Sequence, residues 1–308
     1  MAVPHLTTAL RGPILELEKR ILEAMPAIEH WLRGKWQQHS IPFYCSVDLR
    51  NSGFKLAPVD TNLFPGGFNN LNTDFLPLCV QAMMAAVEKI CPEAHSILII
   101  PENHTRNIYY LQNVHVLERI MRHAGLNVRI GSLIPEITQT TPINLPDGNT
   151  LVLEPIIRKG NRLNVGSFDP CAILLNNDLS SGIPDTLKNL DQIIIPPIHA
   201  GWTTRLKSQH FTAYDRVAQE FAELINIDSW LINPYFNSCG KIDFYEEKGV
   251  DCVVATVDEI LSNIKEKYTQ YEVKEEPFVI VKADAGTYGM GIMTVKDGAD
   301  VYKLNRKQ

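Results

Sequence analysis

The first regular pattern along the chain is helical. Over Gly12–Gln37 apolar residues recur every three or four positions, and Pro13 suits a first helical turn, so one amphipathic packing helix is expected. Phe43–Leu49 then has the character of a strand, the turn residues 51–53 follow, and Phe54–Val59 forms a second short strand pattern. The simplest structure for this stretch is a β-hairpin.

From residue 73 onward, helical patterns alternate with short apolar runs. The predicted helices are Thr73–Ile90, Asn107–Ala124, Thr212–Ile225 and Val257–Tyr268, and the predicted strands are Ser96–Ile100, Asn127–Ile130, Leu151–Arg158, Cys171–Leu175, Ile193–Ile195 and Trp230–Asn233. Gly125 suits a left-handed cap at the end of the second helix. This alternation predicts an α/β fold with an open, mostly parallel sheet that is covered on both faces.

Composition and charge narrow the possible functions. The formal net charge of -6 over 308 residues argues against a nucleic-acid partner, which usually meets a clustered basic surface. No apolar stretch approaches the length of a membrane span, and no signal-peptide pattern opens the chain, so the sequence predicts a cytoplasmic protein. The cysteines lack CxxC pairs and metal-type spacing, and we expect reduced thiols. They are Cys45, Cys79, Cys91, Cys171, Cys239 and Cys252.

The segment Phe278–Val295 contains the most informative motif. A strand pattern ends at Lys282, a glycine-rich turn follows with Gly286, Gly289 and Gly291, and a second strand pattern closes the segment. Glycines let backbone N–H groups approach a phosphate closely, and the lysine adds a positive charge. Walker and Rossmann loops both open a helix, so neither fits. The alternative is a glycine hairpin with an incidental lysine.

This order of strand, lysine, glycine loop and strand resembles the ATP-grasp superfamily. The resemblance implies that Lys282, Gly286, Gly289 and Gly291 bind the phosphates of ATP. In that superfamily an earlier lysine also contacts the nucleotide, and Lys241 stands at the matching distance upstream. A solvated surface lysine is the alternative for Lys241.

A second candidate site is rich in charged and amide side chains between apolar strands. Such groups are costly to bury without partners, and a zwitterionic amino acid would satisfy this mixture of Arg, Lys, Asp and Asn. The alternative is a loop whose caps and turns satisfy one another. The candidate substrate-binding residues are Asp48, Arg50, Asn51, Lys55, Asp60, Asn62, Asn69 and Asn70.

Arg106 is a further candidate, because it follows the strand Ser96–Ile100 and opens a helix. In open α/β sheets the carboxyl ends of the strands usually face the ligand, and a helix N-terminus favours an anion. The alternatives are an internal ion pair for Arg106 and a helix cap for Asn107. Pro196–Lys207 forms a second basic loop, which either closes over substrate or is a solvated turn.

Three motifs make the resemblance more specific. They are Asp48-Leu-Arg50-Asn51, Pro58-Val-Asp60-Thr-Asn62-Leu-Phe-Pro65-Gly-Gly-Phe-Asn69-Asn70-Leu71 and His104-Thr-Arg106-Asn107. Together they resemble the bacterial glutamate–cysteine ligase family of iron oxidisers and other proteobacteria, over essentially the whole chain. The resemblance implies that ATP and Mg²⁺ drive the joining of the glutamate γ-carboxylate to the cysteine amine through an acyl phosphate, the first step of glutathione synthesis.

The resemblance also implies a domain organisation. We expect an N-terminal α/β substrate domain over residues 1–210, a connecting segment over 211–276 and an incomplete glycine-loop lobe over 277–308. No carboxylate set for Mg²⁺ follows Gly291, so the metal ligands are expected in a further lobe. Residues 1–308 alone are therefore expected to have little ligase activity, and homo-oligomerisation through the uncovered surface stays open.

Two other functions remain open at this point. One is another ATP-grasp carboxylate–amine ligase, and the other is a non-catalytic module that binds an amino acid or a nucleotide. A purely structural α/β protein would bind none of these ligands.

Overall fold

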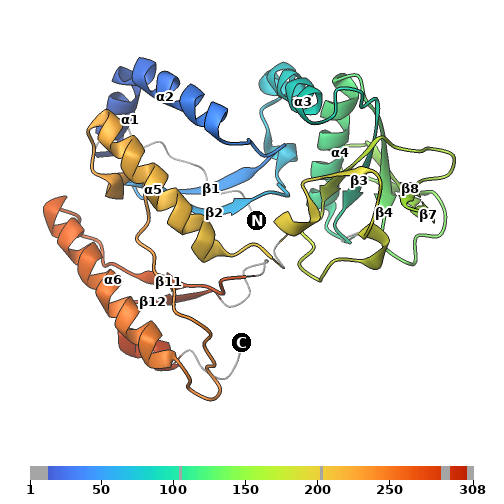
Figure 1. Ribbon diagram of the computed structural model, residues 1–308. Helices are drawn as coiled ribbons and strands as arrows, with labels where there is room; N and C mark the ends of the chain where they lie inside the picture. Colours follow the sequence, from blue (N-terminus) through green and yellow to red (C-terminus); the bar gives the residue numbers. More distant parts are fainter. Residues whose placement is uncertain (1–12, 104–105, 202–203, 286–291, 304–308) are drawn as a thin grey trace. The chain divides into compact units, whose positions relative to one another are not determined.

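The computed structural model describes residues 13–103, 106–201, 204–285 and 292–303, and Figure 1 shows its ribbon. Contacts divide the chain into two compact units. Unit 1 comprises Met1–Ser40, Val47–Asp60 and Arg205–Gln308, and unit 2 comprises Ile41–Ser46 and Thr61–Thr204. This division differs from the three-part domain organisation expected from the sequence, which stays a prediction.

Unit 2 is built on a six-stranded sheet with the order β10-β9-β3-β4-β6-β5. Its strands are β3 (Ser96–Pro101), β4 (Asn127–Ser132), β5 (Thr141–Asn144), β6 (Thr150–Pro155), β9 (Ala172–Asn176) and β10 (Ile193–Ile195). Every neighbouring pair is parallel except β5 with β6. The α/β fold with a mostly parallel sheet, expected from the alternation of patterns, is confirmed.

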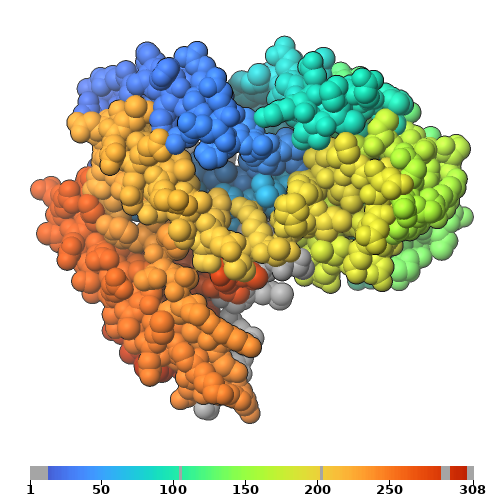
Figure 2. Space-filling view, in the orientation of Figure 1, coloured from blue at the N-terminus to red at the C-terminus, as the bar shows by residue number. Residues whose placement is uncertain are grey.

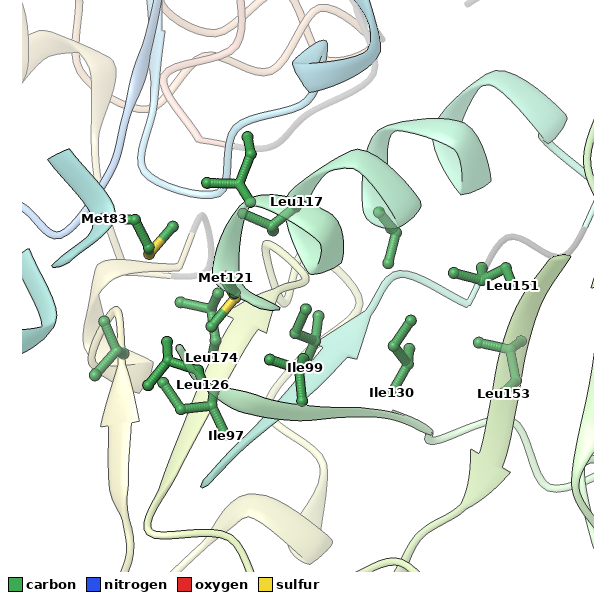
Figure 3. Close-up of a cluster of buried hydrophobic side chains, with 14 of the residues drawn as sticks. Met83, Ile97, Ile99, Leu117, Met121, Leu126, Ile130, Leu151, Leu153 and Leu174 are labelled. Atoms are coloured by element: carbon green, nitrogen blue, oxygen red, sulfur yellow. The ribbon is translucent and has the colours of Figure 1, made fainter. Parts of the chain in front are cut away.

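Alternate residues of β3 face opposite sides of this sheet, as the two-residue period of a strand requires. Ile97 and Ile99 pack into a cluster with the buried side of the helix α4 (Ile108–His123), and α3 (Leu76–Ile90) contributes Met83 to the same cluster (Figure 3). The two helices of unit 2 thus cover one face of the sheet.

The other face is covered by short 3₁₀ turns, irregular segments and a small hairpin. Leu98 and Ile100 join a second buried cluster with residues of β9, of the 3₁₀ turn Asp185–Leu187 and of β8 (Arg162–Asn164), which pairs with β7 (Ile157–Lys159). Both faces are buried, as the sequence predicts. The predicted strand 151–158 is divided into β6 and β7, because β7 leaves the main sheet to pair with β8.

Unit 1 holds the remaining helices and two short sheets. Its elements are α1 (Pro13–Glu23), α2 (Met25–Gln38), β1 (Ser46–Asn51), β2 (Leu56–Asn62), α5 (Lys207–Ile225), α6 (Val250–Gln270), β11 (Val279–Val281) and β12 (Met293–Val295), with β1 and β2 extending a residue or two past its limits. The single predicted helix over residues 12–37 is wrong in one respect: it breaks at Ala24, where Pro26 begins a new first turn.

Helix α2 packs against α5, and their surfaces meet in Figure 2. The Trp31 indole N–H donates to Glu220 Oε1 at 2.7 Å, and Lys35 Nζ lies 2.6 Å from Glu220 Oε2. The Trp31 ring also meets the edge of Phe221. These contacts connect the N-terminal helices to a helix almost two hundred positions later in the sequence.

Helix α6 and the β11–β12 pair share a small core. Val253, Val257 and Leu261 of the helix are buried with Val295 of β12 and Val301 of the 3₁₀ turn Gly298–Lys303. The sequence predicts that this helix begins at Val257, whereas it begins at Val250, after Gly249 in a left-handed conformation with φ of +77°.

The predicted strand Trp230–Asn233 is wrong, because this segment begins as the 3₁₀ turn Ser229–Leu231. Asp228 accepts the Trp230 backbone N–H at 3.0 Å and starts the turn. The buried Trp230 ring stacks on Phe54 and Tyr271. Tertiary packing of an aromatic side chain thus decides a short apolar segment that resembles a strand.

None of the helices within the described residues has the length and apolar character needed to cross a bilayer.

A single added methyl group tests the packing between β4 and its neighbours. A Cβ at Gly131 would lie 2.7 Å from Ile156 Cγ1 and 3.0 Å from Leu98 Cδ1, so Gly131→Ala should destabilise the protein by about 1–3 kcal/mol. At Gly34, inside α2, a Cβ meets nothing within 4 Å, and Gly34→Ala should stabilise by roughly 0.5–1 kcal/mol. Denaturant unfolding of both variants checks this, and equal effects would contradict it.

Candidate functional site

The candidate nucleotide segment lies between two paired strands. β11 and β12 are antiparallel, and Val281 pairs with Met293, so residues 282–292 connect adjacent strand ends. The two predicted strands on either side of the glycine segment are therefore present. Gly286, Gly289 and Gly291 lie outside the described residues, and their role in phosphate binding stays a prediction.

Lys282 follows β11 directly and reaches across unit 1 to the N-terminal hairpin. Its Nζ donates to the carbonyl oxygen of Val59, at 2.9 Å, in a partly buried position. Asp60 is the next residue of β2. The structure thus brings together two residues that the sequence predicts separately, one for the nucleotide and one for the substrate.

Asp284 connects the same segment to the start of α5. Its carbonyl oxygen accepts the backbone N–H of Lys207 at 2.9 Å. Its carboxylate accepts the backbone N–H of Ser208 and the Ser208 hydroxyl, both at 2.7 Å. The helix has no side-chain cap from its own N-cap residue, Leu206. Asp284 therefore supplies a tertiary cap, and a carboxylate at this end of a helix also interacts favourably with the helix dipole.

Positive charge concentrates around these contacts. Burial lowers the pKa of Lys207, while Asp60 and Asp284 raise it and Lys282 and Arg205 lower it, so all of these groups interact electrostatically with one ammonium. We call Asp60, Arg205, Lys207, Lys282 and Asp284 the charged cluster of unit 1. Lysines and an arginine in a partly desolvated group are suited to bind phosphate or carboxylate oxygens.

His210 adjoins the charged cluster, one turn into α5. Its Nδ1 lies 3.2 Å from an Arg205 guanidinium nitrogen. Burial is the largest cause that lowers the pKa of His210, and Arg205 acts in the same direction against Asp60. A neutral imidazole beside an arginine can accept a hydrogen bond from it.

Sequence reasoning included part of this cluster. Asp60 and Lys282 are predicted site residues, and Arg205 and Lys207 belong to the basic loop for which substrate closure and a solvated turn both stay open. It missed Ser208, Asp284 and His210. A signal for Asp284 exists, since it lies two residues after Lys282 in the glycine segment, but its partner Ser208 is far away in sequence.

The other predicted residues of the hairpin have different surroundings. Asp48, Arg50 and Asn51 are exposed on β1. The Asn51 side chain accepts the Gly53 backbone N–H at 2.8 Å, which is the turn-forming role that the alternative reading gives it. Substrate binding by Asp48 and Arg50 stays a prediction.

Lys55 is held in an aromatic pocket of unit 1. Its Nζ donates to the Asn233 carbonyl at 2.7 Å and lies 4.3 Å from the centre of the Trp230 ring. The pKa of Lys55 is lowered to about 7, chiefly by burial; Asp228 opposes this shift and Lys267 contributes to it. Lys267 itself contacts Asp228 at 2.5 Å. These contacts give Lys55 internal partners, and its role in substrate binding stays a prediction.

Asn62, Asn69, Asn70 and Arg106 belong to unit 2. Asn62 accepts the Phe64 backbone N–H at 2.9 Å, which is a local turn contact. Asn69 lines a cavity of about 70 Å³ beneath the 3₁₀ turns at residues 68–75, together with Arg119 of α4. Asn70 and Arg106 are exposed, and His104 lies outside the described residues.

A buried polar network occupies the carboxyl ends of β3 and β9, where the sequence predicts a ligand crevice. Tyr110 Oη donates to Asn176, and it also accepts the Glu102 backbone N–H at 2.8 Å. Asn176 Nδ2 donates to the Pro65 carbonyl at 2.8 Å, and Glu102 accepts the Asp178 N–H at 2.6 Å. These buried and partly buried groups are hydrogen-bonded to one another, as polar groups removed from water generally are.

Lys241 is exposed in the turn that precedes α6. It contributes, after larger hydrogen-bond effects, to the lowering of the pKa of Asp243. Its nucleotide role stays a prediction. Among the residues that the structure describes, no three His, Cys, Asp or Glu side chains gather into a group able to hold a metal ion.

Comparisons with known proteins agree with the resemblance. Residues 18–308 match the family described as glutamate-cysteine ligase. A crystal structure from Methylobacillus flagellatus KT, provisionally named a gamma-glutamylcysteine synthetase, is 66% identical in sequence and superposes with a TM-score of 0.92. The match covers 99% of this chain and 72% of that one. A search of curated proteins found no match.

The buried ammonium of Lys55 should make stability depend on pH. Its pKa falls from an ordinary value of 10.5 to about 7 on folding, so between these values the unfolded chain holds a proton that the folded chain lacks. The free energy of unfolding should therefore rise as pH rises above 7. Between pH 7 and 9 the free energy of unfolding should rise by about 1–2 kcal/mol less in Lys55→Met than in the wild type, a value reduced for solvent screening. Denaturant unfolding across that range checks it.

The matched control is Lys265→Met, an exposed lysine of α6. It should keep the wild-type slope. An unchanged slope in Lys55→Met would contradict the assignment of this dependence to Lys55.

Removing the tertiary cap should loosen the start of α5. Asp284→Ala removes the two oxygens that accept hydrogen bonds from the backbone N–H and the hydroxyl of Ser208. The free energy of unfolding should fall by about 1 kcal/mol, and hydrogen exchange in the first turn of the helix should become faster. Asp284→Asn keeps one acceptor oxygen and should cost less. Hydrogen exchange with mass spectrometry distinguishes them, and unchanged exchange in the alanine variant would refute the role of Asp284.

Proposed function

Because the chain belongs to the glutamate–cysteine ligase family, we propose that it acts in the ATP-dependent joining of glutamate to cysteine, with the charged cluster of unit 1 as its anion-binding centre. The observation that carries this proposal is a pair of contacts made by the segment after β11: Lys282 bonds to β2, and Asp284 bonds to the start of α5. The proposal is supported by the electrostatic interaction of Lys207 with Lys282 and Arg205.

The cations fit the phosphates of ATP chemically. Phosphate oxygens are acceptors without donors, and Lys282, Lys207 and Arg205 are donors that carry positive charge. We propose that Lys282 contacts the transferring phosphoryl group, because it directly precedes the segment with Gly286, Gly289 and Gly291. ATP supplies the phosphoryl group that activates the glutamate γ-carboxylate for attack by the cysteine amine.

The contribution of the chain's own residues is positioning and charge neutralisation. In phosphoryl transfer most of the catalytic effect comes from such preorganised electrostatics. The Val59 carbonyl fixes the ammonium of Lys282, and Asp284 holds the helix that carries Lys207. These contacts are made within the chain itself and orient the side chains that carry the charge.

Asp60 gives the cluster a carboxylate that suits the ammonium of an amino-acid substrate. It interacts electrostatically with Lys207 and His210. We propose that Asp60 orients either the glutamate or the cysteine. The Mg²⁺ that accompanies ATP in this family has no proposed ligand among the described residues, because no suitable acidic group gathers there. The ATP-grasp form of nucleotide binding and a cytoplasmic location belong to the same proposal.

Calorimetric titration tests the function directly. We expect ATP with Mg²⁺ and glutamate each to bind, and glutamate to bind more tightly when nucleotide is present. Binding of ATP without any response to glutamate or cysteine would contradict the ligase proposal and favour a nucleotide-binding module.

Neutralising Lys282 should weaken nucleotide binding. Lys282→Met removes a charge-assisted contact of about 1.5–3 kcal/mol, so the Kd for ATP should rise roughly 10- to 100-fold. Lys265→Met removes an exposed lysine of α6 and should leave the Kd unchanged. Equal Kd values for Lys282→Met and wild type would refute the placement of ATP at Lys282.

A further inference from the structure

Two cysteines that are 13 positions apart in sequence meet in unit 1. The Sγ of Cys252, in the first turn of α6, lies 2.9 Å from the Sγ of Cys239. A disulfide bond has a length of about 2.0 Å, so roughly 0.9 Å of movement would close it. Both thiols are free.

The two thiols differ in their surroundings. Cys239 is partly buried against the core of α6, and its Sγ lies 3.4 Å from the Thr256 hydroxyl. Burial raises the pKa of the Cys239 thiol, and the adjacent Cys252 raises it further. Cys252 is exposed in the first turn of α6, where a small oxidant in solution can reach it. The exposed thiol is therefore suited to attack an oxidant, and the inner thiol to react second.

The remaining cysteines offer a contrast. Cys45 is exposed. The Sγ of Cys171 lies 3.1 Å from the Ser96 hydroxyl oxygen and 3.4 Å from His95 Nδ1. These contacts are to nitrogen and oxygen, so oxidation at Cys171 has no adjacent thiol to complete a disulfide. In the Cys239–Cys252 pair, the thiol that attacks the oxidant and the thiol that completes the disulfide lie next to each other.

We propose that Cys239 and Cys252 form a reversible modification site that reacts with a low-molecular-weight disulfide and closes to an intramolecular disulfide. This proposal is independent of the ligase function, because it depends on the geometry of two thiols and not on any bound substrate. Disulfides in reducing compartments are usually transient and redox-sensing, which suits a pair that stands reduced and in contact.

The reaction balances in two exchange steps. The Cys252 thiolate attacks one sulfur of the small disulfide, forms a mixed disulfide and releases one small thiolate. The Cys239 thiolate then attacks the Cys252 sulfur and releases the second small thiolate. The two cysteines lose two electrons and two protons in total, and the small disulfide is reduced to two thiols by the same two electrons.

Closure has a structural consequence for the segment that follows Cys239. Lys241 and Ile242 lie next to it, and Ile242 packs on the core of α6. A covalent link from Cys239 to α6 would hold residues 239–252 as a closed loop, and reduction would release it. The site therefore controls the mobility of the segment that contains Lys241.

Peptide mapping of the wild-type protein after incubation with oxidised glutathione tests the proposal. We expect a Cys239–Cys252 cross-linked peptide, its loss on addition of dithiothreitol, and slower hydrogen exchange at residues 240–250 in the oxidised form. Cys239→Ser should instead accumulate glutathione on Cys252, and Cys45→Ser should cross-link as wild type does.

Two results would overturn the proposal. One is oxidation at Cys45 or Cys171 while Cys239 and Cys252 both remain open to alkylation. The other is a mixed disulfide on Cys252 in the wild type that never closes. The wild-type mapping decides the matter even where a serine variant fails to fold, since it needs no substitution.

Discussion

The hydrogen bonds between Asp284 and the start of α5 are the contact on which the candidate site depends. They bind the segment after β11 to the first turn of the helix through the backbone N–H groups of Lys207 and Ser208 and the Ser208 hydroxyl. The N-terminal N–H groups of a helix need acceptors from elsewhere when the helix has no cap of its own. Asp284 provides these acceptors, and Lys207 lies in one electrostatic cluster with Lys282 and Asp60.

Internal partners distinguish some polar side chains from those suited to a ligand. Lys55, a candidate, bonds to the Asn233 carbonyl and lies over the Trp230 face. Asn176, which is outside the candidate set, bonds to Tyr110 and the Pro65 carbonyl in the same way. A group with such partners gains little from a substrate. The charged cluster differs, because three cations and two carboxylates interact there, and two of its members, Lys282 and Asp284, follow β11 directly.

The candidate site was predictable only in part. Lys282 and Asp60 could be selected because a lysine beside a glycine loop and an aspartate among apolar strands are unusual patterns, and the structure brings both into one cluster. Ser208 and His210 could not be selected, since a serine and a histidine on a helix have no signal of their own. Asn62 follows Asp60 closely in sequence, yet contacts place it in unit 2. Adjacency in sequence does not decide which unit a side chain joins.

The sequence by itself determined the alternation of helices and strands, the mostly parallel sheet and the resemblance to a ligase family, because hydrophobic period and motif spacing are local properties of the chain. Tertiary structure alone decided that Trp230 sits in a 3₁₀ turn among aromatic rings, that Asp284 caps α5 and that Cys239 meets Cys252. Each of these depends on contacts between segments distant in sequence. Such contacts form where packing and unpaired polar groups demand partners, and no local pattern records them.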